Sequence, residues 1–395
     1  MKLLTKVAFV FLLAHVNQVS AQQITGRFRP EKEHYLVGEP IFIVFEVVNS
    51  TARTVEIAED NCSSFHQPFK VDSAPTKKQF SLFGCQGGFG GSCAGSWHEV
   101  LPGTIYQKRF LLEGPFQLDQ PGIYHIRANR DEEIRSKETN EVVVALNVQS
   151  EFDVDLRLPQ EGELKAAYQP LLNDLQSRDV MVRSLAASAV TQNPPQFTET
   201  AILALAEDRV LASASVEGLK NLASPAARAK LLQMSMTSSP ENLRQAAIQA
   251  LGEIGNPDDC QWILDLASQS INYTQIEAYM AAGRNCKERA IPVLYSLIPT
   301  ADPEPLKGLV FAFGNTSSRR VVSPLISLLQ SPDQNIRRDV AGTLATLTHR
   351  TSKYEIEDIA SALQAYGEWL DWWAAYDKTA PIYNSDQCIE PQPLR

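Results

Sequence analysis

Apolar side chains return every three or four residues between Pro240 and Gly255, and polar residues occupy the positions between them. They lie on one stripe of a helix with 3.6 residues per turn, namely Leu243, Ala247, Ile248, Leu251 and Ile254. Ser239 is a favourable N-cap, and Pro240 suits the first helical position. Gly255 is typical of a helix end, and Asn256-Pro257 of the start of another. The pattern therefore predicts one helix followed directly by a second.

This helix is one copy of a repeat. Its pattern Leu243-Arg244-x-x-Ala247-x-x-x-Leu251 returns 61 residues upstream as Val182-Arg183-x-x-Ala186-x-x-x-Val190 and 93 residues downstream as Ile336-Arg337-x-x-Val340-x-x-x-Leu344. Both separations are multiples of about 31 residues, a length found in helical solenoids. Looser copies are Leu211-x-x-x-Ser215-x-x-x-Leu219, Ile276-x-x-x-Met280 and Leu306-x-x-x-Val310. We predict about six helix pairs, over roughly 163–196, 197–225, 226–258, 259–288, 289–319 and 320–350.

Residues 163–350 resemble the short HEAT-like repeats first described in bilin lyases of the phycobilisome, and Asn242–Asp259 is the best match. The resemblance implies an α-solenoid that usually binds proteins, and in a minority of members a lyase or hydroxylase. The hydroxylases need His-Glu pairs that ligate iron. No such pair occurs in the sequence between 151 and 395, where His349 is the only histidine.

Three arginines occupy the same position of the repeat: Arg183, Arg244 and Arg337. They form either a basic stripe for an anionic partner or a structural ladder. In the ladder, each arginine pairs with the acidic residue just before it, which is Asp179, Glu241 or Asp333. We favour the ladder, because equivalent positions stack along a solenoid.

Residues 22–150 follow a period of two, which is typical of strands. The alternating runs are 41–48, 54–57, 106–112, 122–128 and 141–148, with turn residues between them. Such spacing predicts an antiparallel β-sandwich. Pro-Gly-x-Tyr124 resembles the late strand of immunoglobulin-like domains, where a tyrosine closes a corner. The predicted fold class is therefore multidomain β plus α, an immunoglobulin-like sandwich followed by an α-solenoid.

The first 21 residues have the features of a secretory signal, because Lys2 and Lys6 precede an apolar run and small residues lead to Ala21. Cleavage after Ala21 removes two lysines and changes the net charge from −10 to −12. An acidic chain is a poor ligand for nucleic acid, and no later apolar run is long enough to span a membrane. We therefore expect a secreted or periplasmic protein.

All six cysteines follow the signal, an even number that suits an oxidising compartment. The candidate disulfides are Cys85–Cys93 and Cys260–Cys286, with Cys62 and Cys388 paired or free. Cys260 and Cys286 are expected near the starts of the first helices of adjacent repeats. A zinc site is the alternative, but the sequence lacks Cys-x-x-Cys spacing.

The segment from Cys62 to Trp97 is a long insertion in the predicted sandwich, and its tip contains six glycines. Glycine-rich loops bind phosphate where they lead into a helix, whereas this one returns to a strand. We favour a disulfide-closed surface loop. A recognition loop that carries Phe83, Gln86 and Phe89 is the alternative. His34, His66, His98 and His125 lie in the same half of the chain without metal-ligand spacing.

Near the C-terminus, Trp369, Trp372 and Trp373 fall on one helix face. We favour a cap over the last repeat, within residues 351–377, over an aromatic platform for a peptide or glycan. Residues 378–395 are polar, contain three prolines and predict an extended tail.

No catalytic motif stands above chance, since Gly-x-Ser-x-Gly is missing and the one Ser-x-x-Lys has no partner motif. The sequence predicts an exported, non-enzymatic scaffold or adaptor that binds a protein through its solenoid surface, with no metal and no cofactor. Two alternatives stay open. One is carbohydrate or cell-wall binding through the sandwich and its glycine-rich loop. The other is a lyase or hydrolase of unknown substrate.

Overall fold

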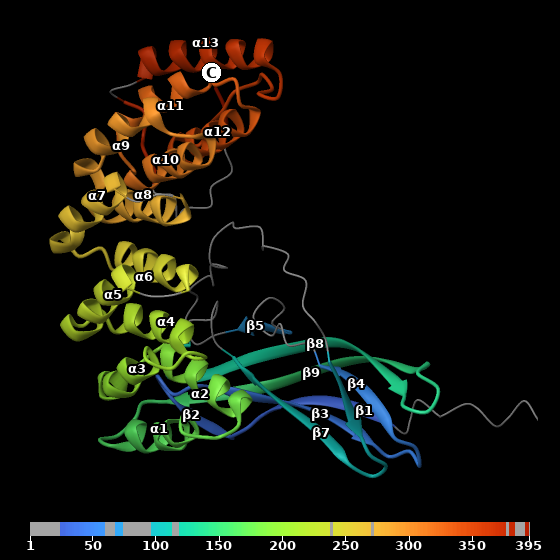
Figure 1. The fold of residues 1–395 in the computed structure, drawn as a ribbon. Helices are drawn as coiled ribbons and strands as arrows, with labels where there is room; N and C mark the ends of the chain where they lie inside the picture. The colour runs from blue at the N-terminus through green and yellow to red at the C-terminus, as the bar shows by residue number, and fades with distance from the viewer. Residues whose placement is uncertain are drawn as a thin grey trace, which may run out of the picture. The chain divides into compact units, whose positions relative to one another are not determined.

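The computed structural model describes residues 24–59, 68–73, 96–112, 118–237, 240–269, 272–376, 379–383 and 392–394. The chain divides between Gln169 and Pro170 into two units, called here the β unit and the helical unit (Figure 1). The change from a period of two to a period of 3.6 along the sequence agrees with this order of strands and helices. The predicted signal sequence lies outside the described residues.

The β unit has two sheets. Its described strands are β1 (Ile24–Pro30), β2 (His34–Leu36), β3 (Phe42–Asn49), β4 (Val55–Glu59), β5 (Phe69–Ser73), β6 (Ser96–Val100), β7 (Ile105–Leu111), β8 (Gly122–Ser136) and β9 (Val142–Arg157). The smaller sheet has the order β1-β3-β7, and the larger has the order β2-β9-β8-β4-β6 with β5 also paired to β8. The pairings are antiparallel except between β2 and β9.

One hydrophobic core contains buried residues of both sheets. At its centre the ring of Phe28 from the smaller sheet lies 4.8 Å from Phe45 and 5.7 Å from Phe69 of β5, between ring centroids. The Phe28–Phe69 pair is edge-on, a geometry that aromatic rings prefer. The segment from Cys62 to Trp97 is therefore not a simple insertion, because its strand β5 contributes Phe69 to the core.

Tyr124 closes the turn before β8. Its buried hydroxyl donates a hydrogen bond to the carbonyl of Gln120 at 3.0 Å, and the Gln120 N–H donates back to that hydroxyl at 3.3 Å. This is the corner that the Pro-Gly-x-Tyr124 pattern predicts. β8 and β9 are longer than the predicted runs and pair continuously along most of their length.

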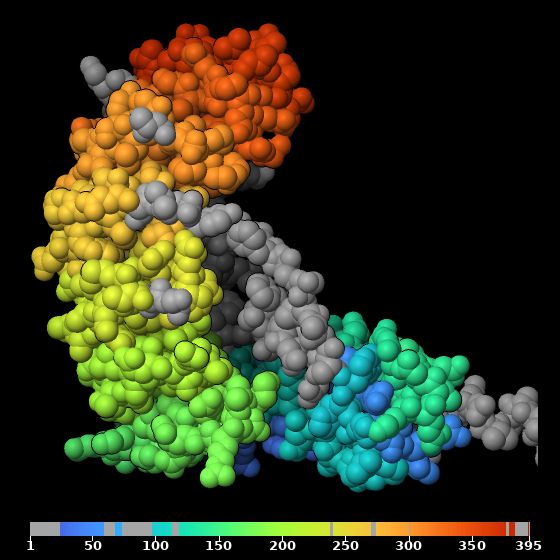
Figure 2. All heavy atoms as spheres, in the orientation of Figure 1, coloured from blue at the N-terminus to red at the C-terminus, as the bar shows by residue number. Residues whose placement is uncertain are grey.

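The helical unit consists of successive helix pairs. The first and second helices of each pair are α1 (Glu163–Asp174) and α2 (Val180–Gln192), α3 (Glu199–Leu205) and α4 (Ala212–Leu222), α5 (Pro225–Thr237) and α6 (Glu241–Ile254), α7 (Cys260–Gln269) and α8 (Asn272–Cys286), α9 (Ile291–Leu297) and α10 (Pro303–Thr316), and α11 (Val322–Leu328) and α12 (Gln334–Thr348). The first turns of α1 belong to the β unit, where the Tyr168 hydroxyl donates to the Gly38 carbonyl at 3.0 Å. Along the helical unit, colour bands follow one another in sequence order, as expected when each pair packs on its neighbours (Figure 2).

The boundaries of α6 follow from its sequence. Gly255 ends the helix in the left-handed conformation, with φ of 67°, and the Asn256 side chain caps the next turn by accepting from the Asp258 N–H at 2.9 Å. The helix begins at Glu241, so the predicted placement of Pro240 at the first helical position is wrong: Pro240 has an extended backbone and lies one position before the helix. Ser239, the predicted N-cap, lies outside the described residues.

Second helices approach one another at glycines spaced 31 residues apart. The contacts are Gly252 of α6 with Ala281 of α8, Gly283 of α8 with Ala312 of α10, and Gly314 of α10 with Thr343 of α12. A Cβ atom on Gly283 would lie 2.2 Å from the carbonyl oxygen of Ala312, and one on Gly252 would lie 2.7 Å from the Cα of Ala281. The helix backbones are therefore in direct contact at these two positions, an approach that glycine permits because it has no Cβ.

Cys260 and Cys286 form a disulfide, with their Cα atoms 5.2 Å apart. Cys260 begins α7, whereas Cys286 ends α8, so the bond closes one helix pair. The predicted bond is present, but the predicted placement of Cys286 in the next pair is wrong, because α8 extends to that residue. The other four cysteines lie outside the described residues.

Helix α13 (Ile359–Tyr376) follows the last pair and covers it. Trp369, Trp372 and Trp373 are 1%, 8% and 9% exposed and belong to the core of the helical unit. The Trp373 indole N–H donates to the Ser323 hydroxyl of α11 at 3.0 Å. This burial agrees with a cap and leaves little aromatic surface for a ligand.

The C-terminal tail returns to the end of α12. Tyr383 donates its N–H to the Leu347 carbonyl at 2.9 Å, and its ring stacks on His349 with 3.5 Å between centroids. Further along, β11 (Gln392–Pro393) pairs in parallel with β10 (Arg350–Thr351). At 379–383 and 392–394, the tail that was expected to be extended therefore packs against the helical unit.

The glycine contacts predict opposite effects for one substitution at two sites. Gly283→Ala should destabilise the helical unit, because overpacking costs about 1–3 kcal/mol and outweighs a gain of up to about 1 kcal/mol in helix propensity. Gly342→Ala on α12 is the matched control, since no atom lies within 4 Å of its added Cβ. It should raise stability by up to about 1 kcal/mol. Thermal unfolding measures both, and shifts of the same sign would contradict the contact at Gly283.

His349 predicts a loss of stability in mild acid. It is 6% exposed, and burial lowers its pKa. Between the lowered pKa and the ordinary value of about 6.5, the unfolded chain binds a proton that the folded chain does not. The contribution of the neutral His349 side chain to the free energy of unfolding is therefore fully present above pH ~6.5. It is lost as the pH falls through the pKa of the folded state. His349→Gln should weaken this pH dependence in urea unfolding at pH ~7 and pH ~5; an unchanged difference between the two pH values would refute it.

Candidate protein-binding surface

The outward sides of the second helices form a surface with the same 31-residue spacing as the glycine contacts. Gln249, Met280 and Phe311 each lie three residues before one of the contact glycines, and Gly342 continues this row on α12. Phe311 is 46% exposed, although its neighbours Val310 and Ala312 are fully buried. The row therefore presents an aromatic side chain to solvent in the middle of a tightly packed helix.

Ile276 of α8 lies beside α10 one turn before Phe311. A Cβ atom on Gly308, one turn before Phe311, would lie 3.0 Å from Cγ2 of Ile276. The missing side chain at Gly308 thus lets Ile276 rest on α10 beside the turn that carries Phe311. Met280 lies one turn after Ile276, and both are half-buried. We call Ile276, Met280 and Phe311 the Phe311 patch.

Half-buried carboxyl groups lie on α8, which carries part of the patch, and on α12, the last of the second helices. Burial raises the pKa of Glu277 on α8 and of Asp339 on α12. One carboxyl oxygen of Glu277 is buried and has no hydrogen-bond partner among the described residues. A partner that supplies a cationic donor would relieve this desolvation, because an unsatisfied buried acceptor costs free energy.

Other charges on these helices link successive repeats. Glu253 of α6 forms ion pairs with Lys220 of α4 at 3.1 Å and with Arg284 of α8 at 3.5 Å. Burial alone would raise the pKa of Glu253, but hydrogen bonds from Gln249 and Lys220 hold it below its ordinary value. These charges form ion pairs within the chain. Arg284 also acts electrostatically on Glu277, but one Glu277 oxygen lacks a hydrogen bond among the described residues.

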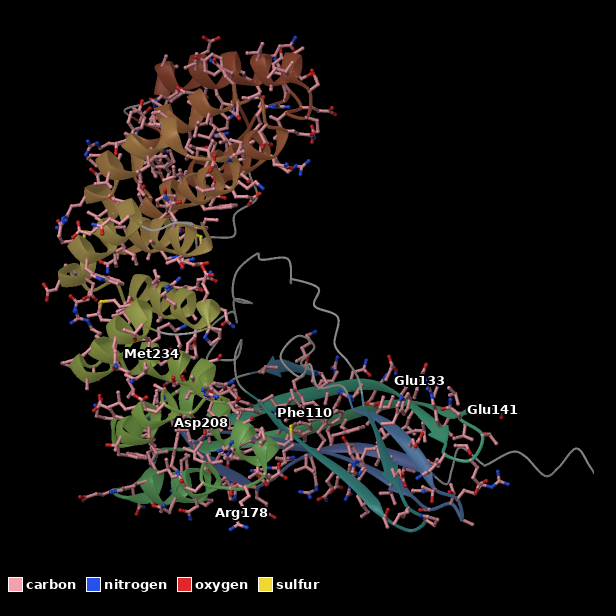
Figure 3. All side chains as sticks on the ribbon, in the orientation of Figure 1. Phe110, Glu133, Glu141, Arg178, Asp208 and Met234 are labelled. Atoms are coloured by element: carbon pink, nitrogen blue, oxygen red, sulfur yellow. A yellow bond between two sulfur atoms is a disulfide. The ribbon has the colours of Figure 1, made fainter. Side chains whose placement is uncertain are left out.

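Of the three arginine pairs predicted for the ladder, the structure has only that of Arg244 with Glu241. Arg183 pairs at 3.1 Å with Asp208, in the turn before α4 of the next repeat. Asp208 is labelled in Figure 3. Arg244 lies 3.8 Å from Glu241, as predicted, and also donates to Thr274 of the next second helix at 3.2 Å.

Arg337 extends the ladder to the segment before α13. It is 3% exposed and donates to the backbone carbonyls of Ser331, Pro332, Ile356 and Glu357. Asp179 and Asp333 are not the partners of their arginines, because each caps its own helix by accepting a backbone N–H. Each arginine of the ladder therefore ties its repeat to the next segment of the chain.

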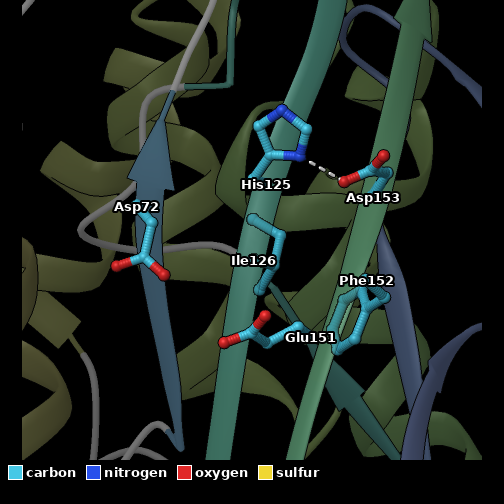
Figure 4. Close-up of a pocket in the computed structure, with 6 residues that line it drawn as sticks. All are labelled: Asp72, His125, Ile126, Glu151, Phe152 and Asp153. Atoms are coloured by element: carbon cyan, nitrogen blue, oxygen red, sulfur yellow. Dashed lines mark hydrogen bonds and ion pairs between the residues drawn. The ribbon is translucent and has the colours of Figure 1, made fainter.

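The β unit has a charged pocket of about 380 Å³ between β5, β8 and β9, lined by Asp72, His125, Ile126, Glu151, Phe152 and Asp153 (Figure 4). His125 and Asp153 pair through the imidazole Nδ1 and are 58% and 57% exposed. Arg127 pairs with Asp72 at 3.1 Å and with Glu151 at 3.2 Å. These groups pair across strands at a solvated surface, so the pocket is a weaker candidate than the Phe311 patch.

The histidines of the N-terminal half and the candidate recognition residues fall outside the Phe311 patch. His34 pairs with Asp155 on the β unit at 2.9 Å, and the His98 ring lies 5.0 Å from that of Tyr106. Within the part of the chain that the structure describes, no three His, Cys, Asp or Glu side chains gather as a metal site. His66 and the candidate recognition residues Phe83, Gln86 and Phe89 lie outside the described residues.

The exposure of the Phe311 patch could have been predicted from the sequence, but α8 was aligned with α6 in the wrong register. Ile276 and Met280 were aligned with the buried stripe of α6, but the 31-residue spacing aligns Leu243 with Thr274 and Ala247 with Ala278. Thr274 and Ala278 are the buried residues, and Ile276 and Met280 are half-exposed. Aligning the repeats on Gly252, Gly283 and Gly314, which are 31 residues apart, would have given the correct register.

Comparisons with known families agree with the repeats. Residues 198–283 and 229–312 match HEAT repeats, and residues 320–349 match an Armadillo/beta-catenin-like repeat. The chain therefore contains HEAT and Armadillo-type repeats. No helix among the described residues combines the length and apolar character that a membrane span requires.

One solved structure similar to the chain is the complex of CpcE and CpcF of phycocyanin lyase from Nostoc sp. PCC7120. The identity is 18%, the TM-score is 0.34, and the match covers 45% of this chain and 76% of that one. No curated protein matches the sequence.

Proposed function

We propose that this chain is an exported scaffold or adaptor that binds another protein through the Phe311 patch. The observation that carries the proposal is the exposure of Phe311 on a helix whose adjacent residues are buried. An aromatic side chain in an apolar surface is a typical energetic centre of a protein interface. The HEAT repeats add support, since stacked helix pairs form extended binding surfaces.

Glu277 and Asp339 favour a particular partner chemistry. The partner would place an apolar side chain beside Phe311 and a lysine or arginine near the half-buried carboxyl groups. Such complementarity speeds association and selects among partners more than it adds affinity. Binding without turnover is the activity expected of such a scaffold.

We propose that the β unit is an immunoglobulin-like module that accompanies this scaffold. Its two sheets around one core and the Tyr124 corner support that assignment. Glycan binding by this unit is the weaker alternative. Its exposed Trp97 is stacked by the Arg135 guanidinium, 3.9 Å from the ring centroid, which leaves less of its surface for a sugar.

Phe311→Glu tests the binding proposal. The full chain, used as bait against its own cell envelope, should capture a protein that the variant binds at least about tenfold more weakly, because a charge replaces an apolar anchor. Tyr295→Glu on α9 is the matched control, since Tyr295 is 55% exposed on a first helix. Unfolding of each variant verifies its fold.

The proposal requires that the control retain the partner. Equal capture by wild type, Phe311→Glu and Tyr295→Glu would place binding elsewhere on the chain. Turnover of a substrate by the purified chain would argue against a scaffold.

A further inference from the structure

Helix α13 has a second apolar face, opposite its buried tryptophans. Ala360, Leu363, Gly367, Leu370 and Ala374 form a stripe that we call the outer seam. Leu363 and Leu370 are 51% and 41% exposed, and nothing lies within 4 Å of a Cβ atom placed on Gly367. The terminal repeat of a solenoid normally presents a polar outer face, so an exposed apolar seam indicates a binding surface.

The spacing of the outer seam is that of a coiled coil. Its residues follow one another at alternating intervals of three and four, which are the a and d positions of a heptad. The two leucines occupy d, and alanine or glycine occupies a. Helices with this pattern bury the seam against another helix.

We infer that the outer seam pairs with the same seam of a second copy of this chain, with the two α13 helices antiparallel. In that arrangement Leu363 meets Ala374 of the second copy and Gly367 meets Leu370, so each large side chain faces a small one. A parallel pair would place leucine on leucine and glycine on glycine, which leaves a void at Gly367 and packs poorly. One two-fold axis relates all these contacts, as a closed dimer requires.

The polar residues beside the seam fit the same arrangement. Gln364 and Asp371 lie on the same flank, two turns apart. Antiparallel pairing brings equal flanks together, so each Asp371 carboxylate meets a Gln364 amide of the second copy. The only other charge on α13, Glu368, already accepts hydrogen bonds from the Ser352 hydroxyl and the Lys353 N–H of its own chain. No like charges therefore oppose one another across the seam.

The seam is short, which limits the affinity. Ala360 to Ala374 spans about 21 Å at 1.5 Å per residue. One such contact is smaller than the roughly 1,200 Å² of a standard stable interface, so a dissociation constant on the order of 10 μM is expected. This inference is independent of the proposed function, because it concerns another surface of the helical unit.

Sedimentation velocity of the full chain between about 1 μM and about 300 μM tests the dimer, since this range brackets that affinity. Leu363→Glu combined with Leu370→Glu should raise the dissociation constant more than about 100-fold, because four charges would enter an apolar seam. Gly367→Leu should raise the dissociation constant at least about tenfold, because Leu370 of the second copy would then face a large side chain instead of glycine. It should not lower the melting temperature, since leucine is a better helix former than glycine.

Met181→Glu is the control, because Met181 is 68% exposed on α2, outside the seam. It should leave the dimer unchanged. A single monomeric species at all concentrations overturns the inference, as does a dimer that survives both seam variants. A dimer weakened equally by Met181→Glu overturns it too, because association would then not depend on the seam.

Discussion

Direct backbone contact between successive second helices is the constraint on which the helical unit depends. At Gly283 the neighbouring carbonyl of Ala312 occupies the space that a side chain would need. Such an approach fixes the distance between α8 and α10, and the 31-residue spacing repeats it along the chain. The larger apolar side chains then fill the space between the first and second helices, as Leu294 and Leu325 do.

The same glycine contacts help to place the Phe311 patch on the second helices. The side chains three residues before each contact glycine are exposed or half-exposed, whereas those four residues before it are buried. Phe311 and Met280 occupy this row, and Gly308 allows Ile276 to join them. The ion pairs of Glu253 and the arginine ladder act between repeats, so they stabilise the stack without involving the Phe311 patch.

The sequence predicted the architecture better than the individual contacts. Helix caps and stops depend on local residues such as Gly255 and Asn256, and these were predictable from sequence alone. The partner of Arg183 was not, because Asp208 is 25 residues away and only the stacking of repeats brings it close. Likewise, Cys286 was assigned to the wrong helix because periodicity does not give the length of α8. To predict that Ile276 is half-exposed, the repeats must be aligned in the correct register. The alignment based on apolar residues alone was shifted by two residues, because it placed Ile276 where Thr274 belongs.

Native-state hydrogen exchange followed by mass spectrometry tests the central role of the second-helix layer most directly. If backbone contact at the glycines holds the stack together, amides of α6, α8 and α10 should exchange last, together and with one common free energy of opening. Amides of the first helices α7, α9 and α11 should exchange earlier. Protection that persists in the first helices after α8 and α10 have exchanged would contradict the account.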